Sequence, residues 1–337
     1  MTIAHQGNRT SREFYFSVII PTYNRREILE KTLKALEEQT LSKEIFEVIV
    51  VNDGSTDDTA DFLERYKNRG LLNFTYVSKE NEGQGIARNT GFDISDAKIL
   101  VFLGDDCIPA PNFLEEHQVV HDKYFTENFI CLGLTTWSSE IEVTPYMLFL
   151  EDIGMQFKYK ALENAKLIDY QMQLRMADHR FFYTSNISLK RTLFERQQFH
   201  PGFKKYGWED VELGFRLIQD EGAVILYNPN AKCSHVHHMT VDNMKERMIA
   251  VGKSAKRAAT INKRLKIRPG ILKTIFFALI ALPPILLILK KIADKATSTS
   301  TKQLPFALKV YYYALMKKWF LVGLHLRKRK KQTGTEE

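Results

Sequence analysis

The sequence predicts an α/β protein with a mostly parallel sheet, and two observations carry that prediction. Four runs in the first hundred residues are almost continuously apolar, as is typical of parallel strands covered on both faces: Phe16–Ile20, Phe46–Val51, Leu72–Val77 and Ile99–Leu103. Segments with helical spacing lie between them: Arg26–Glu38, Asp57–Asn68 and Gly83–Ile94. This alternation implies right-handed crossovers and a Rossmann-like sheet with helices on both faces.

Charge is distributed unevenly along the 337 residues, so the net charge of +8 hides two different regions. From Lys245 to Glu337 there are 22 Lys and Arg against 4 Asp and Glu, whereas residues 1–244 carry 26 bases and 36 acids. An acidic body with a basic tail is not the pattern of a nucleic-acid-binding protein. It suits attachment of the tail to an anionic membrane surface.

The N-terminus and the cysteines indicate a reducing compartment. Residues 1–14 form a polar lead without the apolar run of a signal peptide. The three cysteines lack metal-ligand spacing, and their odd count does not suggest a disulfide framework. We therefore expect a cytoplasmic location.

Polar segments follow the first two predicted strands. Pro21-Thr22-Tyr23-Asn24 ends the first, and Asn52-Asp53-Gly54-Ser55 ends the second. In an open α/β sheet, ligands bind at the carboxyl ends of the strands. The carboxylate of Asp53 can accept hydrogen bonds from a pyrimidine edge, and Gly54 permits a sharp turn. The alternative is that Asn-Asp-Gly-Ser is only a favourable turn.

A glycine-rich segment, Asn81–Gly91, places Arg88 near the start of a helix. The planar guanidinium suits a diphosphate. The glycines do not have the spacing of a dinucleotide or P-loop fingerprint, so this segment alone is a weak signal.

Paired carboxylates, Asp105 and Asp106, follow the fourth predicted strand. Adjacent buried carboxylates repel each other unless a cation neutralises them, and a divalent ion bridging them to a diphosphate would also stabilise a departing nucleotide. A solvated acidic turn is the alternative.

A second carboxylate pair, Glu209 and Asp210, lies at the predicted start of a helix that runs to about Glu221 and ends at Gly222. A strand, Val224–Tyr227, should follow, and then a loop with His235, His237 and His238. Asp210 is a candidate general base, and a helix N-cap is the alternative.

Taken together, four blocks in fixed order resemble the inverting glycosyltransferases of family 2, which have the GT-A fold: Val18–Asn24, Val48–Asp57, Leu103–Asp106 and Gly207–Asp210. The resemblance covers about residues 15–240. The donor-side residues that it implies are Pro21, Thr22, Tyr23 and Asp53 around the nucleoside, Arg88 near the donor and Asp105 at the ribose. Asp106 would bind Mn²⁺ or Mg²⁺. The first acid of the family's Asp-x-Asp motif is replaced here by Gly104.

The resemblance extends to the acceptor side through Ser185–Ser188 and the Gly-Trp-Glu-Asp block. It implies that Asp210 is the base, that Glu209 orients the acceptor and that Trp208 stacks on a sugar face. His235 would contact the metal or the diphosphate, although a solvated loop histidine is equally compatible with the sequence.

Two apolar segments lie in the basic tail, Ile271–Leu289 and Leu304–Leu326. The first contains Pro283-Pro284 and is barely long enough to span a bilayer, and the second is interrupted by lysines. Because both flanks are basic, we expect helices that lie in the cytoplasmic interface or form a shallow hairpin. A buried or oligomeric helical pair is the alternative.

We therefore divide the chain into a lead (1–14), a nucleotide-sugar half (15–112), an acceptor and catalytic half (113–245) and a helical tail (246–337). The expected function is transfer of a sugar, with inversion, from a nucleoside-diphosphate donor, UDP first, to a hydroxyl on a glycan or lipid-linked acceptor. Two rival functions stay open: a sugar-phosphate nucleotidyltransferase and a non-catalytic GT-A scaffold that recruits a partner enzyme. The sequence leaves the oligomeric state open.

Overall fold

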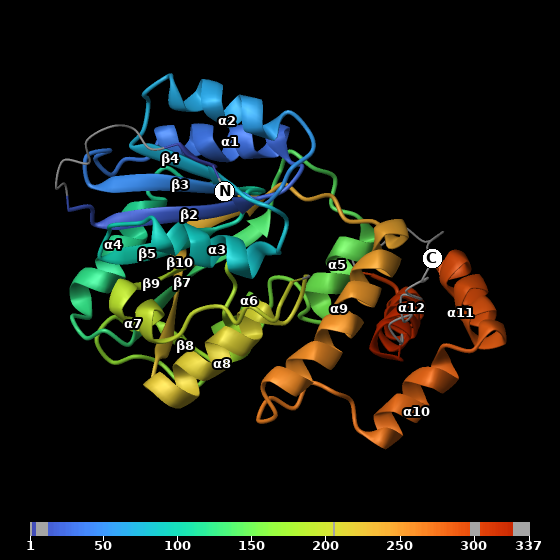
Figure 1. Ribbon diagram of the computed structural model, residues 1–337. Helices are drawn as coiled ribbons and strands as arrows, with labels where there is room; N and C mark the ends of the chain where they lie inside the picture. The colour runs from blue at the N-terminus through green and yellow to red at the C-terminus, as the bar shows by residue number, and fades with distance from the viewer. Residues whose placement is uncertain (1, 5–12, 205, 297–303, 326–337) are drawn as a thin grey trace, which may run out of the picture. The chain divides into compact units, whose positions relative to one another are not determined.

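The computed structural model describes residues 2–4, 13–204, 206–296 and 304–325. Its contacts divide the chain into two compact units, Met1–Met239 and Thr240–Glu337. The first unit contains a 10-stranded sheet, and the second consists of helices (Figure 1). The basic run that begins at Arg327 lies outside the described residues.

The first half of the sheet is parallel, as predicted. It comprises β2 (Phe16–Thr22), β3 (Phe46–Asn52), β4 (Phe74–Ser78) and β5 (Ile99–Leu103), in the spatial order β4-β3-β2-β5. The intervening helices are α1 (Arg26–Glu37), α2 (Thr59–Lys67) and α3 (Gln84–Asp93). A short strand, β1 (Thr2–Ala4), pairs antiparallel with β4.

Helices cover both faces of this parallel half because its strands are apolar on both sides. Val18, Ile20 and Val50 pack with the buried faces of α1 and α2, which lie on one side of the sheet (Figure 1). Ile19 and Val51, which alternate with them, pack with α3 on the other side. The prediction of helices on both faces is confirmed.

The second half of the sheet is mixed. β9 (Asn186–Lys190) lies antiparallel between β5 and β7 (Phe129–Trp137), and β7 pairs in parallel with β10 (Val224–His235). The edge strands β6 (Cys107–Pro109) and β8 (Arg175–Ala177) both pair antiparallel with β10. The remaining helices of this unit are α4 (Phe113–Lys123), α5 (Pro145–Asp152), α6 (Tyr159–Glu163), η1 (His179–Phe181), α7 (Arg191–Arg196) and α8 (Glu209–Glu221).

Strand β10 differs from the prediction. The sequence predicts a strand that ends at Tyr227, followed by a loop that contains His235, but β10 continues to His235. The register with β7 shifts between Asn228 and Lys232, so the Asn-Pro-Asn stretch is a bulge rather than the end of the strand. Placing His235 in a loop is therefore wrong, and the strand fixes its backbone.

A buried polar network holds β9 in place. Asn186 donates to the carbonyl oxygens of Leu134 (3.2 Å) and Ala231 (2.9 Å), and its Oδ1 lies 3.0 Å from His117 Nε2. Gly133 leaves room for this side chain, because a Cβ there would lie 2.3 Å from Asn186 Oδ1. The network fixes the strand that follows directly after Thr184 and Ser185.

The helical unit contains α9 (Val241–Ile261), α10 (Ile271–Ile280), α11 (Pro283–Ala296) and α12 (Phe306–His325). Helices α9 and α12 cross at two glycines: a Cβ at Gly252 would lie 2.2 Å from Phe320 O, and one at Gly323 would lie 2.2 Å from Ile249 O. The predicted apolar segment 271–289 is divided between α10 and α11, because a helix does not continue through Pro283 without loss of hydrogen bonds. The segment 304–326 largely coincides with α12.

Candidate functional site

The loops after β2 and β3 are joined by hydrogen bonds. Asn24 Oδ1 accepts from the backbone N–H of Thr56 (2.7 Å), and the Asn24 N–H donates to Ser55 Oγ (2.9 Å). Pro21 and Thr22 are buried within β2 itself, whereas Tyr23 is 47% exposed. Of Pro21, Thr22 and Tyr23, only Tyr23 therefore presents an accessible side chain at this edge of the sheet.

Asp53 is buried, and its carboxylate is engaged within the protein. It accepts hydrogen bonds from the backbone N–H groups of Glu82 (3.0 Å) and Gly83 (2.8 Å) and from Lys79 Nζ (3.2 Å). Gly54 adopts φ +80° and leaves no room for a Cβ, which would lie 2.7 Å from Asn81 N. The predicted sharp turn is confirmed. An ionised carboxylate has about four acceptor positions, so Asp53 retains little capacity for a nucleobase, and its role there stays a prediction.

Asp105 and Asp106 lie at the end of β5 and are both buried. Thr22 Oγ1 donates to Asp105 Oδ2 (2.9 Å). Arg25, which the sequence analysis did not single out, donates from Nη1 to Asp105 Oδ1 (3.1 Å) and to Asp106 Oδ2 (2.5 Å). The repulsion that suggested a metal ion is therefore relieved here by a guanidinium. Burial raises the pKa of Asp105, and the charge of Arg25 offsets part of that rise.

Two histidines face Asp106, His235 at the end of β10 and His237 two residues beyond it. His235 Nε2 lies 3.3 Å from Asp106 Oδ1, and His237 Nδ1 lies 3.5 Å from Asp106 Oδ2. Burial acts to raise the pKa of Asp106, but interactions with His235, His237 and Arg25 hold it well below its usual range. Asp106 is therefore an ionised carboxylate at neutral pH.

Glu209 and Asp210 form the first turn of α8. Glu209 is buried and accepts a hydrogen bond from Gln84 Nε2. Thr184 Oγ1 donates to Asp210 Oδ2 (2.9 Å), whereas Asp210 Oδ1 has no hydrogen-bond partner among the described residues. Burial raises the pKa of both carboxyl groups, and the neighbouring charge of Asp210 raises that of Glu209 further.

Arg88 lies beside this carboxylate pair. Its side chain is 3% exposed, its Nη1 is 3.9 Å from Asp210 Oδ1, and its guanidinium lies over the ring of Phe199. Nε and Nη1 of Arg88 are buried without a hydrogen-bond partner among the described residues. The structure thus places Arg88 next to the candidate base, and the predicted contact with the donor stays a prediction.

The N-cap of α8 is Trp208, so the alternative that Asp210 only caps the helix is wrong. Trp208 adopts φ +73°, which is an outlier for a bulky residue, and it follows Gly207 at φ +107°. Unusual backbone of this kind is concentrated at functional sites. The predicted stacking of Trp208 on a sugar stays a prediction.

Comparison with known proteins decides the family. Residues 17–195, more than half of the chain, match the family model described as Glycosyl transferase family 2. The chain belongs to glycosyl transferase family 2. It is 31% identical to validoxylamine A glucosyltransferase of Streptomyces hygroscopicus subsp. limoneus over 229 residues, which cover 64% of this chain and 50% of that protein. The chain thus spans about half the length of that relative.

Solved structures show the same GT-A fold. The mannosyltransferase PcManGT from Pyrobaculum calidifontis, in complex with GDP-Man and Mn²⁺, has a TM-score of 0.60 at 19% identity, covering 93% of this chain and 86% of that one. Residues 1–349 of S. aureus TarS in complex with UDP give a TM-score of 0.50 at 15% identity, covering 92% of this chain and 90% of that one. The predicted fold class is confirmed.

The family's divalent metal fits the residues around Asp106. Asp106, Cys107 and His235 each offer one ligand atom, and these atoms lie within 4.8 Å of one another. His235 also has a buried Nδ1 without a hydrogen-bond partner among the described residues. The Cys233 side chain and burial raise the pKa of Cys107 well above its usual range, so its thiol stays protonated. The carboxylate and the imidazole are therefore the residues that would hold Mn²⁺ or Mg²⁺.

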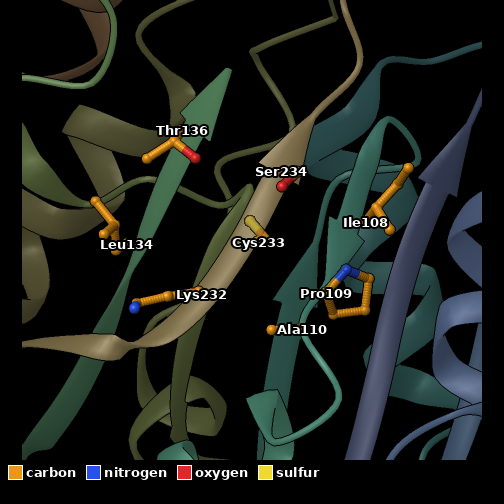
Figure 2. Close-up of a pocket in the computed structure, with 8 residues that line it drawn as sticks. All are labelled: Ile108, Pro109, Ala110, Leu134, Thr136, Lys232, Cys233 and Ser234. Carbon is orange, nitrogen blue, oxygen red and sulfur yellow. The ribbon is translucent and has the colours of Figure 1, made fainter. Parts of the chain in front are cut away.

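A cavity of about 340 Å³ lies beside β6, β7 and β10 (Figure 2). Its lining is mostly apolar, and Lys232 and Ser234 of β10 flank Cys233 in the view. None of the predicted donor, metal or catalytic residues lines it. The two carboxylate pairs, rather than this cavity, are therefore the candidate site.

Replacing Thr184 with Val is expected to move the acidic limb of the kcat/KM profile to higher pH. The Thr184 hydroxyl lowers the pKa of Asp210, so its removal raises that pKa. As the candidate base, Asp210 must be deprotonated to act. As the pH falls, the variant is therefore expected to lose activity at a higher pH than the wild type does. Thr75→Val, in β4, is the control and should leave the profile unchanged. An unshifted profile in Thr184→Val would contradict the positioning role of Thr184.

Proposed function

We propose that the protein is an inverting glycosyltransferase that moves a sugar from a nucleoside-diphosphate donor, with UDP favoured, to a hydroxyl acceptor. The observation that carries the proposal is the Glu209–Asp210 pair at the start of α8. There Thr184 holds one oxygen of Asp210, and the other oxygen has no hydrogen-bond partner among the described residues. Family membership and the retained carboxylates at the end of β5 support the same function.

Asp210 is the proposed general base. It takes the proton of the acceptor hydroxyl while the acceptor oxygen bonds to the anomeric carbon and the bond from that carbon to the diphosphate breaks. A single displacement of this kind inverts the configuration. Glu209, which is buried and bonded to Gln84, is the proposed acceptor-orienting residue, and Trp208 is the proposed sugar-stacking residue.

The donor side of the proposal is built around the ends of β2, β3 and β5. Thr22 and Arg25 hold Asp105 in position, which we assign to the ribose. Asp106 and His235 would hold Mn²⁺ or Mg²⁺, which when bound offsets the charge of the departing diphosphate. TarS in complex with UDP and PcManGT in complex with GDP-Man show that this fold accommodates either nucleotide. We favour UDP because TarS, which is 35% identical to this chain over 109 residues, has been solved in complex with UDP.

A donor panel with a mixed acceptor extract tests this function. Purified protein is incubated with UDP-, GDP- and dTDP-sugars and Mn²⁺, and the released nucleotide is measured. Release of one nucleoside diphosphate is expected. Pyrophosphate release from a nucleoside triphosphate and a sugar phosphate would instead indicate a nucleotidyltransferase.

We further propose that the helical unit binds the cytoplasmic face of the cell membrane and that the acceptor is a lipid-linked or cell-envelope glycan precursor. No single helix among the described residues is long and apolar enough to span a bilayer. Together, α10 and α11 are, although the pair is bent by 63°. Their side chains include exposed apolar residues: Ile271, Leu272, Ile275, Phe276, Leu279, Leu287, Ile288 and Ile292. Apolar side chains beside lysines are typical of interfacial helices.

Vesicle flotation tests the membrane proposal. The protein should float with vesicles that contain phosphatidylglycerol, bind phosphatidylcholine vesicles less, and be released from the anionic vesicles by salt. Phe276→Glu should reduce flotation, and Val119→Glu, at a half-exposed apolar position in α4, is the control. Equal behaviour of the two variants would contradict a role for α10.

A further inference from the structure

Arg25 is bonded to both carboxylates at the end of β5 and to a histidine. Nη1 lies 3.1 Å from Asp105 Oδ1 and 2.5 Å from Asp106 Oδ2, and Nη2 lies 3.3 Å from His237 Nδ1. The Arg25 side chain is 35% exposed, whereas the two carboxylates are about 10% exposed or less. One edge of the guanidinium is therefore engaged with the acids while part of the side chain still reaches solvent.

The charges in this cluster are closely balanced. Two carboxylates and one guanidinium leave a formal charge of −1, whereas an acid at position 104 would have made it −2. A Cβ at Gly104 would lie 3.0 Å from both Asp106 Oδ1 and Cys107 Sγ, so the cluster is also packed against that position. A divalent cation near Asp106 would be repelled by the positive charge of Arg25. Repulsion between like charges a few ångströms apart is substantial in a partly buried site.

The two oxygens of Asp106 face different partners. Oδ2 faces Arg25 and His237, and Oδ1 faces His235 and Cys107. The Asp106 oxygen that lies beside the candidate metal ligands is thus Oδ1, whereas Arg25 contacts Oδ2. Arg25 can therefore oppose a divalent ion through its charge without occupying the His235 side of the carboxylate.

We propose that Arg25 is a resident counter-ion that keeps the affinity of this site for a divalent cation low until a nucleoside diphosphate is bound. A diphosphate brings at least two negative charges, and a guanidinium is a strong partner for phosphate oxygens. The bound anion offsets the charge of Arg25, and cation and nucleotide therefore bind in a coupled manner. The identity of the anion as the donor's diphosphate rests on the proposed function.

This proposal can be tested without turnover by titrating the full-length protein with Mn²⁺ alone and measuring the free ion by its EPR signal. Arg25→Met should bind Mn²⁺ at least about tenfold more tightly than the wild type. Arg25→Lys, which keeps the charge, should stay within about threefold of the wild type. Arg26→Met is the matched control, because the neighbouring Arg26 pairs with Glu30 and Asp58 instead. If Arg25→Met unfolds, Arg25→Gln replaces it.

Repeating the titration with UDP and GDP measures the coupling. A diphosphate should strengthen Mn²⁺ binding by the wild type by a larger factor than it strengthens binding by Arg25→Met. Equal affinities of Arg25→Met and wild type for Mn²⁺ alone would overturn the counter-ion role even if nucleotides bind. If neither nucleotide binds but Arg25→Met still gains Mn²⁺ affinity, the proposed donor fails and the counter-ion role stands.

Discussion

Replacing Asp210 with Asn is expected to lower the transfer rate by about 10²- to 10⁴-fold, the range typical of removing a general base. The amide keeps the shape of the side chain and can still accept from Thr184, but it cannot take a proton. Binding of the nucleoside diphosphate should stay unchanged, because the residues assigned to the nucleoside and the metal lie at or near the ends of β2, β3, β5 and β10, and Asn keeps the shape of the side chain beside Arg88. Steady-state rates and calorimetric titration measure the two effects separately.

Asp220→Asn is the matched control for that variant. Asp220 is exposed near the end of the same helix, so its replacement alters the charge of α8 without changing its first turn. It should keep the wild-type rate. Retained turnover in Asp210→Asn would remove this residue from the role of base and direct attention to Glu209.

Replacing Asp106 with Ala is expected to weaken Mn²⁺-dependent binding of the nucleoside diphosphate by more than about 100-fold and to remove most transfer activity. Loss of residues that merely support metal ligands costs about 10- to 100-fold, and Asp106 is itself a candidate ligand. The variant also leaves Arg25 with Asp105 as its one carboxylate partner among the described residues. The measurement is calorimetric titration with and without Mn²⁺.

Asp58→Ala provides the comparison for Asp106→Ala, because the Asp58 side chain is 61% exposed. It should bind as the wild type does. Unchanged metal dependence in Asp106→Ala would show that the cation, if any, is held elsewhere, and His235 would then lose its assignment as well.

The parallel half of the sheet could be predicted because the strands are buried on both faces and therefore consist of nearly unbroken apolar runs. Phe46–Asn52 and Ile99–Leu103 begin where the sequence predicts. The antiparallel strand β9 was not predicted, because Asn186 and Ser188 interrupt its apolar run and its pairing depends on segments more than 50 residues away. The length of β10 was not predicted either. Asn-Pro-Asn is a typical turn sequence, and the bulge that it forms here depends on pairing with neighbouring strands.

The acids of the candidate site and two of their partners, Thr22 and His235, were named from the sequence, but Arg25 and Thr184 were missed. Asp105 and Asp106 stand out because adjacent carboxylates after a buried strand are unusual. Arg25 does not stand out, because it precedes them by 80 residues and its role depends on how the loop after β2 closes over β5. Thr184 has no local signature either. Hydrogen-bond partners that are distant in sequence are brought together only by the tertiary fold. The acids, in contrast, can be recognised from sequence because they directly follow a predicted strand.

The most direct test of a nucleotide-sugar transferase is calorimetric titration of the detergent-solubilised protein with UDP, GDP and dTDP, each with and without Mn²⁺. We expect one diphosphate, UDP first, to bind and Mn²⁺ to strengthen its binding. Failure of all three to bind under both conditions would contradict the account, and Gly104 would then mark a GT-A scaffold that has lost its donor site.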